Sequence, residues 1–171
     1  KMHSNSVHVW LGPTHECGLN QERLGYLTRG LYASPRYLER AGMPKHPEEL
    51  NQHAWIDLLN SAPNGLLLSH PEHGEYTFNP PRSRLRVDLT ALHIDAIARS
   101  QGIGLLAHWL TAKREQHHPG ELINCLRDWE PAPLPITLLY AYGHQSRRTH
   151  ALLEFLRSQV PAQWRTSTAA A

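Results

Sequence analysis

The chain has 171 residues, of which 40% are hydrophobic and 19% are charged, and its formal net charge is +2. This length suits one ordinary domain or two small lobes, and the composition excludes an intrinsically disordered chain, in which low apolar content accompanies high net charge. It also disfavours a dedicated nucleic-acid surface, because such surfaces cluster positive charge and no run of five Lys or Arg residues occurs.

Apolar and polar residues alternate in the N-terminal part of the chain, which predicts strands separated by turns. The expected strands here are 7–11, 24–33 and 54–59, with a polar loop over 14–22. Between the last two strands, Ser34 is a good N-cap, Pro35 suits the first helical position, and Gly42 ends the helix. Pro47 begins a second short helix that runs through Leu50.

The rest of the chain predicts a hairpin, followed by strands that alternate with helices. Residues 60–65 have turn chemistry, and the apolar segments 66–68 and 76–78 on either side of 71–74 indicate the hairpin. The expected strands that follow are 85–89, 103–106, 122–126 and 136–142, and the expected helices are 90–101, 108–116 and the segment after Ser146. This alternation predicts βαβ units and therefore an α/β sheet.

Three stretches, in this order, resemble one protein family. They are Leu31–Leu38 (LYASPRYL) with Gly42-Met43-Pro44 and Pro47–Leu50; Leu85–Asp88, a helix and Gly102–Leu106 (GIGLL); and Leu126–Trp129 with Pro133–Ile136. Over roughly residues 7–160 the chain resembles the effector-binding domain of LysR-type transcriptional regulators. Ala107 is a departure, because it stands where the family usually has proline.

The resemblance implies an α/β fold like that of periplasmic binding proteins, with two lobes joined by crossing strands and the first lobe incomplete. Residues 1–30 would end the first lobe, 31–140 would form the second, effector-binding lobe, 141–160 would return as a helix to the first lobe, and 161–171 would be a tail. It further implies a small-molecule effector in the cleft between the lobes. DNA would be bound only by a winged helix-turn-helix that this chain lacks, in a homodimer or tetramer of the intact protein.

Ligands of α/β sheets lie beyond the carboxyl ends of strands, where helix N-termini present unpaired N–H groups. Helices are expected to begin directly after strands at Ser34, at Asp88–Thr90 and at Ala107–His108. Such N–H groups and the helix dipole favour an anion, so a small carboxylate is the predicted effector, whereas the carboxylate of Asp88 itself favours a cation or an amine. The candidate effector-binding residues are Ser34, Asn60, Ser61, Asp88, Thr90, Ala107 and His108.

Plainer interpretations stand beside this one. Ser34 and Thr90 are suited to cap helices, and Asn60 and Ser61 are suited to form a turn. In the last helix, Leu152, Leu153 and Leu156 are expected in the core.

No cofactor or metal is predicted. The histidine-containing segments 15–17, 70–73 and 117–118 lack a second cluster at metal-binding spacing and suit solvated loops. Gly102-Ile103-Gly104 lacks the third glycine of a dinucleotide-binding loop and predicts a tight packing corner instead. The absence of GxSxG and Walker A motifs argues against an enzyme, although a small hydrolase or transferase stays as an alternative.

The cellular setting is predicted from what the chain lacks. Cys17 and Cys125, far apart and outside any CxxC, favour a reducing cytoplasm over a disulfide scaffold. No apolar stretch approaches the roughly 18 residues of a membrane helix, and residues 1–6 have no apolar signal core. A cytoplasmic protein without a membrane partner is expected, and a standalone or periplasmic solute-binding protein is the main alternative.

Overall fold

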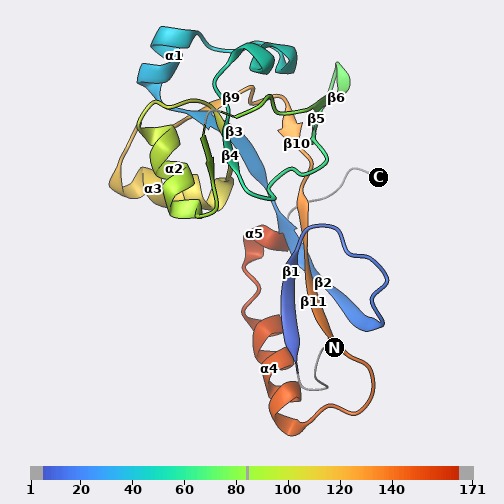
Figure 1. Cartoon of the computed structure of the whole chain (residues 1–171). Coiled ribbons are helices and arrows are strands. Elements are labelled where there is room, and N and C mark those ends of the chain that lie inside the picture. Colours follow the sequence, from blue (N-terminus) through green and yellow to red (C-terminus); the bar gives the residue numbers. More distant parts are fainter. Residues whose placement is uncertain (1–5, 84, 166–171) are drawn as a thin grey trace. The chain divides into compact units, whose positions relative to one another are not determined.

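The computed structural model describes residues 6–83 and 85–165. The chain divides into two compact units (Figure 1). Unit 2 is the continuous segment Arg29–Ala132, and unit 1 consists of the chain before it and after it. The last expected segment, 161–171, begins with the short helix α5 (Ala162–Arg165), and its residues 166–171 lie outside the described part.

Unit 1 is built on a three-stranded antiparallel sheet in the order β1-β11-β2. Its elements are β1 (Val7–Leu11), β2 (Leu19–Leu27), β11 (Leu134–Ala141), α4 (Arg147–Ser158) and α5. The predicted range 31–140 for the second lobe includes most of β11, whose backbone partners β1 and β2 both belong to unit 1. The side chain of Ser146 caps α4, as predicted, by accepting a hydrogen bond from the backbone N–H of Thr149.

Two predictions for unit 1 are wrong. The segment 14–22 is not a loop throughout, because β2 begins at Leu19 and its polar residues pair with β11. Backbone hydrogen bonds to β11 make the end of this segment a strand. The polar side chains of the segment do not indicate this pairing. On α4, Leu153 is buried as predicted, but 45% of Leu152 is exposed.

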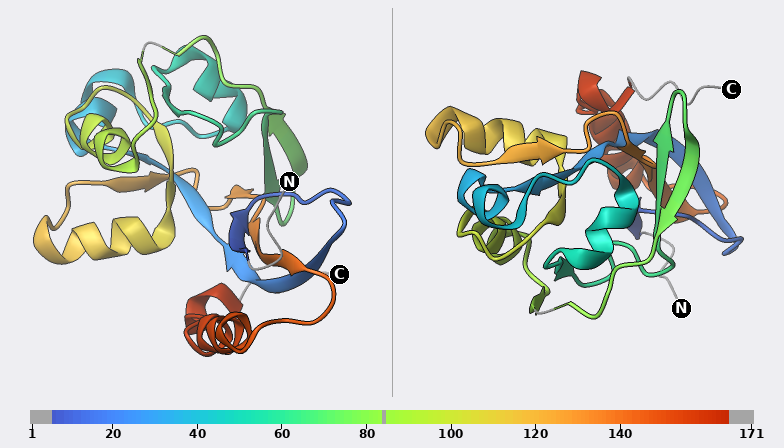
Figure 2. Two further views of the ribbon diagram at one scale, coloured as in Figure 1. Left: turned by 60° about the horizontal axis from the view of Figure 1, so that its bottom comes forward. Right: turned by 90° about the horizontal axis from the view of Figure 1, so that it is seen from above.

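Unit 2 holds the larger set of strands (Figures 1 and 2). They are β3 (Arg29–Ala33), β4 (Ile56–Leu58), β5 (Leu66–His70), β6 (Gly74–Phe78), β7 (Leu85–Val87), β8 (Gly104–Ala107), β9 (Ile123–Cys125) and β10 (Glu130–Pro131). The predicted hairpin is confirmed by β5 and β6, in which Leu66 lies opposite Phe78 and Leu68 lies opposite Tyr76.

The direction of each strand in unit 2 decides which of the residues that follow the strands lie together at one edge of the sheet. β3 lies between β8 and β9 and is antiparallel to both, whereas β4 and β7 are parallel to each other. A parallel bridge between Trp55 and Ile103, just before β4 and β8, joins these two sets of strands. β4, β7 and β8 therefore run in one direction and β3 runs in the other.

The helices of unit 2 begin where the sequence predicts them. They are α1 (Pro35–Ala41), the 3-10 helix η1 (Pro47–Gln52), α2 (Thr90–Ala98) and α3 (His108–His117). Ser34 caps α1, and Pro35 occupies its first position, as predicted. Among the described residues, no helix combines the length and apolar character needed to cross a membrane.

The core of unit 2 is closely packed around the segment Gly102–Gly104. Phe78, Leu68 and Ile103 are all 0% exposed. A Cβ atom at Gly102 would overlap the backbone of Ala54, and one at Gly104 would overlap the side chain of Ile97. The prediction of a tight packing corner at these glycines is confirmed.

His93 on α2 gives the fold a pH dependence. It is 1% exposed and bonds the carbonyl of Ile56 through Nε2 at 2.9 Å. Burial lowers the pKa of His93, against smaller opposing effects of the Ile56 carbonyl and Asp57. The unfolded chain therefore takes up this proton at a higher pH than the folded chain does, and the free energy of unfolding falls as the pH drops below about 6.5.

We expect His93→Leu to make this dependence shallower by up to about 1.4 kcal/mol per pH unit, as measured by urea unfolding between pH 7 and pH 5. The slope does not vanish, because burial also lowers the pKa of His53 and of His108. His150→Leu, at an exposed position of α4, is the control. An unchanged slope in the His93 variant would contradict this explanation.

Candidate functional site

The residues that follow three parallel strands gather at one edge of the sheet in unit 2, which we call the carboxyl edge. Asn60 and Ser61 follow β4, Asp88 and Thr90 follow β7, and Ala107 and His108 end and follow β8. Because these strands run in the same direction, all the predicted site residues except Ser34 are brought to this edge. Arg29 joins them, since it begins the antiparallel strand β3 directly opposite Ala107.

Ser34 is at the other end of the sheet, so the expectation that all three helix starts converge is wrong. It follows the carboxyl end of β3, which is antiparallel to β8. Ser34 is 3% exposed, and its Oγ lies 2.8 Å from the Oγ of Ser100 while accepting the N–H of Tyr37. Its plainer interpretation as a helix cap is confirmed.

The two helices that begin at the carboxyl edge have no side-chain cap. The N-cap of α2 is Leu89, so the capping role considered for Thr90 is wrong, and the N-cap of α3 is Ala107. Neither helix has an acidic residue in its first turn. The first-turn N–H groups of α2 and α3 therefore lack a side-chain acceptor, and such groups attract anions. Ala107 has φ −64°, the value that a proline at this position would impose.

Arg29 is the charged residue that the sequence analysis missed. It is 8% exposed and donates from Nη1 to the carbonyl of Ser61 at 2.9 Å and from Nη2 to that of Ala132 at 3.3 Å. Its Nε has no partner, and no described carboxylate forms an ion pair with it. Burial lowers the pKa of Arg29 to about 10, so the guanidinium keeps its charge at neutral pH. A buried charge without a counter-ion is costly, and an anion would compensate it.

His108, the first residue of α3, is held beside Arg29. Its Nδ1 lies 2.7 Å from the hydroxyl of Tyr32. Burial lowers the pKa of His108, against the opposing effects of Glu130 and the backbone of Arg29. Gly30 makes room for the ring, because a Cβ there would lie 2.5 Å from Cε1 of His108. At neutral pH this imidazole is neutral and adds no charge to the edge.

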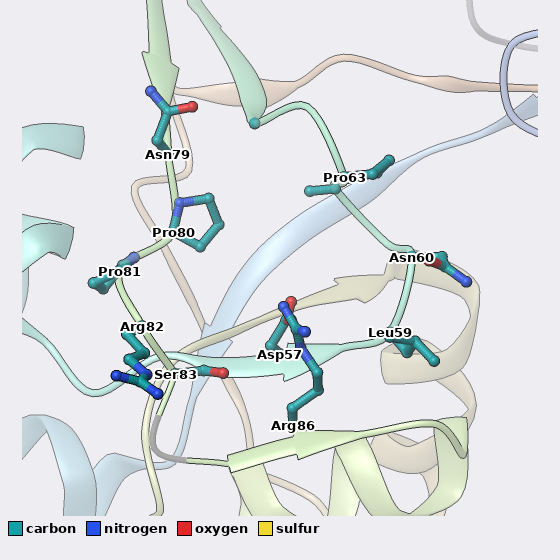
Figure 3. Close-up of a pocket in the computed structure, with 12 residues that line it drawn as sticks. Asp57, Leu59, Asn60, Pro63, Asn79, Pro80, Pro81, Arg82, Ser83 and Arg86 are labelled. Carbon is teal, nitrogen blue, oxygen red and sulfur yellow. The ribbon is translucent and has the colours of Figure 1, made fainter.

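A cavity of about 640 Å³ opens beside this edge (Figure 3). Asp57 and Arg86 meet inside it in an ion pair of 2.7 Å. Of the predicted site residues, only Asn60 is among its described lining residues. Asp57 and Arg86 neutralise each other, and Arg82, which lines the cavity without an ion pair among the described residues, is exposed to solvent. This cavity therefore calls for a counter-ion less strongly than the buried Arg29 does. Among the described residues, no group of three His, Cys, Asp or Glu side chains is placed to hold a metal ion.

Comparison with known proteins assigns the family. The family model described as "LysR substrate binding domain" matches residues 7–161. The chain belongs to this family. The LysR domain is 39% identical over 156 residues to the iron-regulated virulence regulatory protein IrgB of Vibrio cholerae, covering 91% of this chain and 52% of that protein. It is also 30% identical to the uncharacterized regulator YhjC of Escherichia coli, covering 85% of this chain and 48% of that protein.

Solved structures share the fold of this chain. The full-length Vibrio cholerae virulence activator AphB, described as a member of the LTTR protein family, matches with a TM-score of 0.77 at 24% identity, over 91% of this chain and 52% of that one. The regulatory domain of AphB from Vibrio vulnificus matches with a TM-score of 0.76 at 21% identity, over 92% and 78%. The predicted α/β fold of the LysR regulatory domain is thus confirmed. The chain spans about half the length of the curated relatives it matches.

Proposed function

We propose that this domain is the effector-sensing part of a LysR-type transcriptional regulator, and that it binds a small carboxylate at the carboxyl edge of unit 2. One observation carries the proposal: the buried guanidinium of Arg29, which has no counter-ion among the described residues, lies at the same edge as two helix N-termini that have no side-chain cap. A carboxylate would accept charge-assisted hydrogen bonds from Arg29 and further bonds from first-turn N–H groups.

Asn60, Ser61, Thr90, Ala107 and His108 are proposed to surround the effector, with Asp88 limiting how much negative charge the edge accepts. In this role the domain binds and does not catalyse, and it works in the cytoplasm as part of a homodimer or tetramer. A ligand with different affinities for two conformations would shift their populations. This shift would change how another part of the regulator binds DNA.

Thermal unfolding in the presence of small aliphatic and aromatic carboxylates tests this proposal. A true effector at 100 times its Kd adds about 2.7 kcal/mol to the free energy of unfolding. The corresponding primary amides are the matched controls, because they keep the shape of the acids and lack the charge. Stabilisation by an acid and not by its amide is the expected result. Equal effects of an acid and its amide, or no stabilisation by any acid, would overturn the carboxylate proposal.

A further inference from the structure

A positively charged cavity lies at the opposite end of β3 from the carboxyl edge. Here a cavity of about 480 Å³ lies between α1 and the end of α2, lined by Arg36, Arg40, Arg99, Ser100 and Gln101. Ser100 is tied to the cap of α1 through the 2.8 Å contact between its Oγ and that of Ser34. The cavity is therefore anchored to a buried part of unit 2, although its arginines are exposed.

The lining carries three positive charges and no described carboxylate. Arg40 is held in place, because its Nη2 donates to the carbonyl of Ser100 at 3.0 Å and its guanidinium lies 5.6 Å from the ring centre of Tyr37. Arg36 and Arg99 have no ion pair or side-chain hydrogen bond among the described residues. Their donors are consequently free to bind a ligand.

Backbone electrostatics explain only part of this cluster. Arg40 and Arg99 lie at C-terminal ends of helices, where a cation is favourable, but Arg36 is the second residue of α1, where a cation is unfavourable. Two nearby carbonyl groups that would repel an anion are already occupied, because Arg40 binds that of Ser100 and the Nε2 of Gln101 binds that of Arg99 at 3.2 Å. The net field of the cavity is positive.

We propose that this cavity binds a phosphate group of a small molecule. Phosphate presents several charged oxygen atoms in three dimensions, which suits guanidinium groups that approach from two helices. A carboxylate has only two oxygen atoms in one plane, which a single arginine satisfies. The site is separate from the carboxyl edge, so the regulator would respond to two different ligands.

Isothermal titration of the chain with inorganic phosphate, pyrophosphate and a nucleoside monophosphate, at constant ionic strength, tests the proposal. We expect binding by the wild type and a weakening of at least roughly tenfold in the double variant Arg36→Ala/Arg99→Ala. Both side chains are exposed and unpaired, so this variant should fold normally, and its unfolding temperature checks that. Tighter binding of the nucleoside monophosphate than of phosphate would support an organic phosphate as the natural ligand, and equal binding would support free phosphate.

The double variant Arg147→Ala/Arg148→Ala is the matched control, because it removes the same charge from exposed positions of α4. Equal losses in the two double variants would show a response to net charge alone and would overturn the proposal. Absence of binding by the wild type at millimolar concentrations would overturn it as well. So would binding of a short DNA duplex through Arg36 and Arg99 without binding of the small phosphates, because the ligand would then be nucleic acid.

Discussion

Replacing Arg29 with methionine is expected to raise the Kd for the carboxylate effector by roughly 10- to 150-fold, as measured by isothermal titration with an acid that stabilises the wild type. Hydrogen bonds to charged groups contribute about 1.5–3 kcal/mol, which corresponds to this loss of affinity. Methionine fills similar space, so the fold should survive the change. Removing a buried charge that has no counter-ion relieves a desolvation penalty, which offsets the lost hydrogen bonds to Ser61 and Ala132.

Two further variants separate charge from geometry. Arg29→Lys keeps the positive charge but loses the planar fork of donors, and we expect it to retain part of the affinity. Arg127→Met removes a charge from an exposed position of unit 2 that has no ion pair among the described residues, and it should leave the Kd unchanged. If Arg29→Met binds the acid as tightly as the wild type does, the guanidinium is not the counter-ion and the proposed site is misplaced.

Much of the fold was predictable because its signals are local. Ser34 and Pro35 specify the start of α1 by capping chemistry, and the turn-rich segment between Leu68 and Tyr76 specifies the hairpin of β5 and β6. Glycine spacing at 102–104 likewise revealed the packing corner. In each case the signal lies in residues that are neighbours in the sequence, although the atoms packed against Gly102 come from the distant Ala54.

The candidate site was only partly predictable, because it depends on strand direction and burial. The rule that helix starts gather at the carboxyl ends of strands was right for α2 after β7 and α3 after β8, but it failed for Ser34 because β3 is antiparallel to β8. Arg29 was missed because its burial results from contacts with Ser61 and Ala132, which are distant in sequence. The available signal was a single charged residue within the segment 24–33 that is otherwise uncharged and predicts a strand.

Gly30→Val should displace the side chain of His108 at the carboxyl edge. Gly30 lies on β3, where a Cβ atom would come within 2.5 Å of Cε1 of His108 and 2.9 Å of Cε2 of Tyr32. The imidazole must then move, and its 2.7 Å hydrogen bond to Tyr32 is lost. We expect the free energy of unfolding to fall by roughly 1–3 kcal/mol, as overpacked cores generally show. We also expect the pKa of His108, followed by NMR titration, to rise as the ring becomes more exposed.

A double-mutant cycle with His108→Ala isolates the contact behind this effect. When the imidazole is absent, the shortest of these contacts is removed and the one with Tyr32 remains, so Gly30→Val should cost less by about 1 kcal/mol in the His108→Ala background. The sign of this coupling distinguishes a clash with His108 from a general preference of β3 for glycine. Equal costs in the two backgrounds would show that the imidazole does not pack on Gly30, and the placement of His108 beside Arg29 would then have to be abandoned.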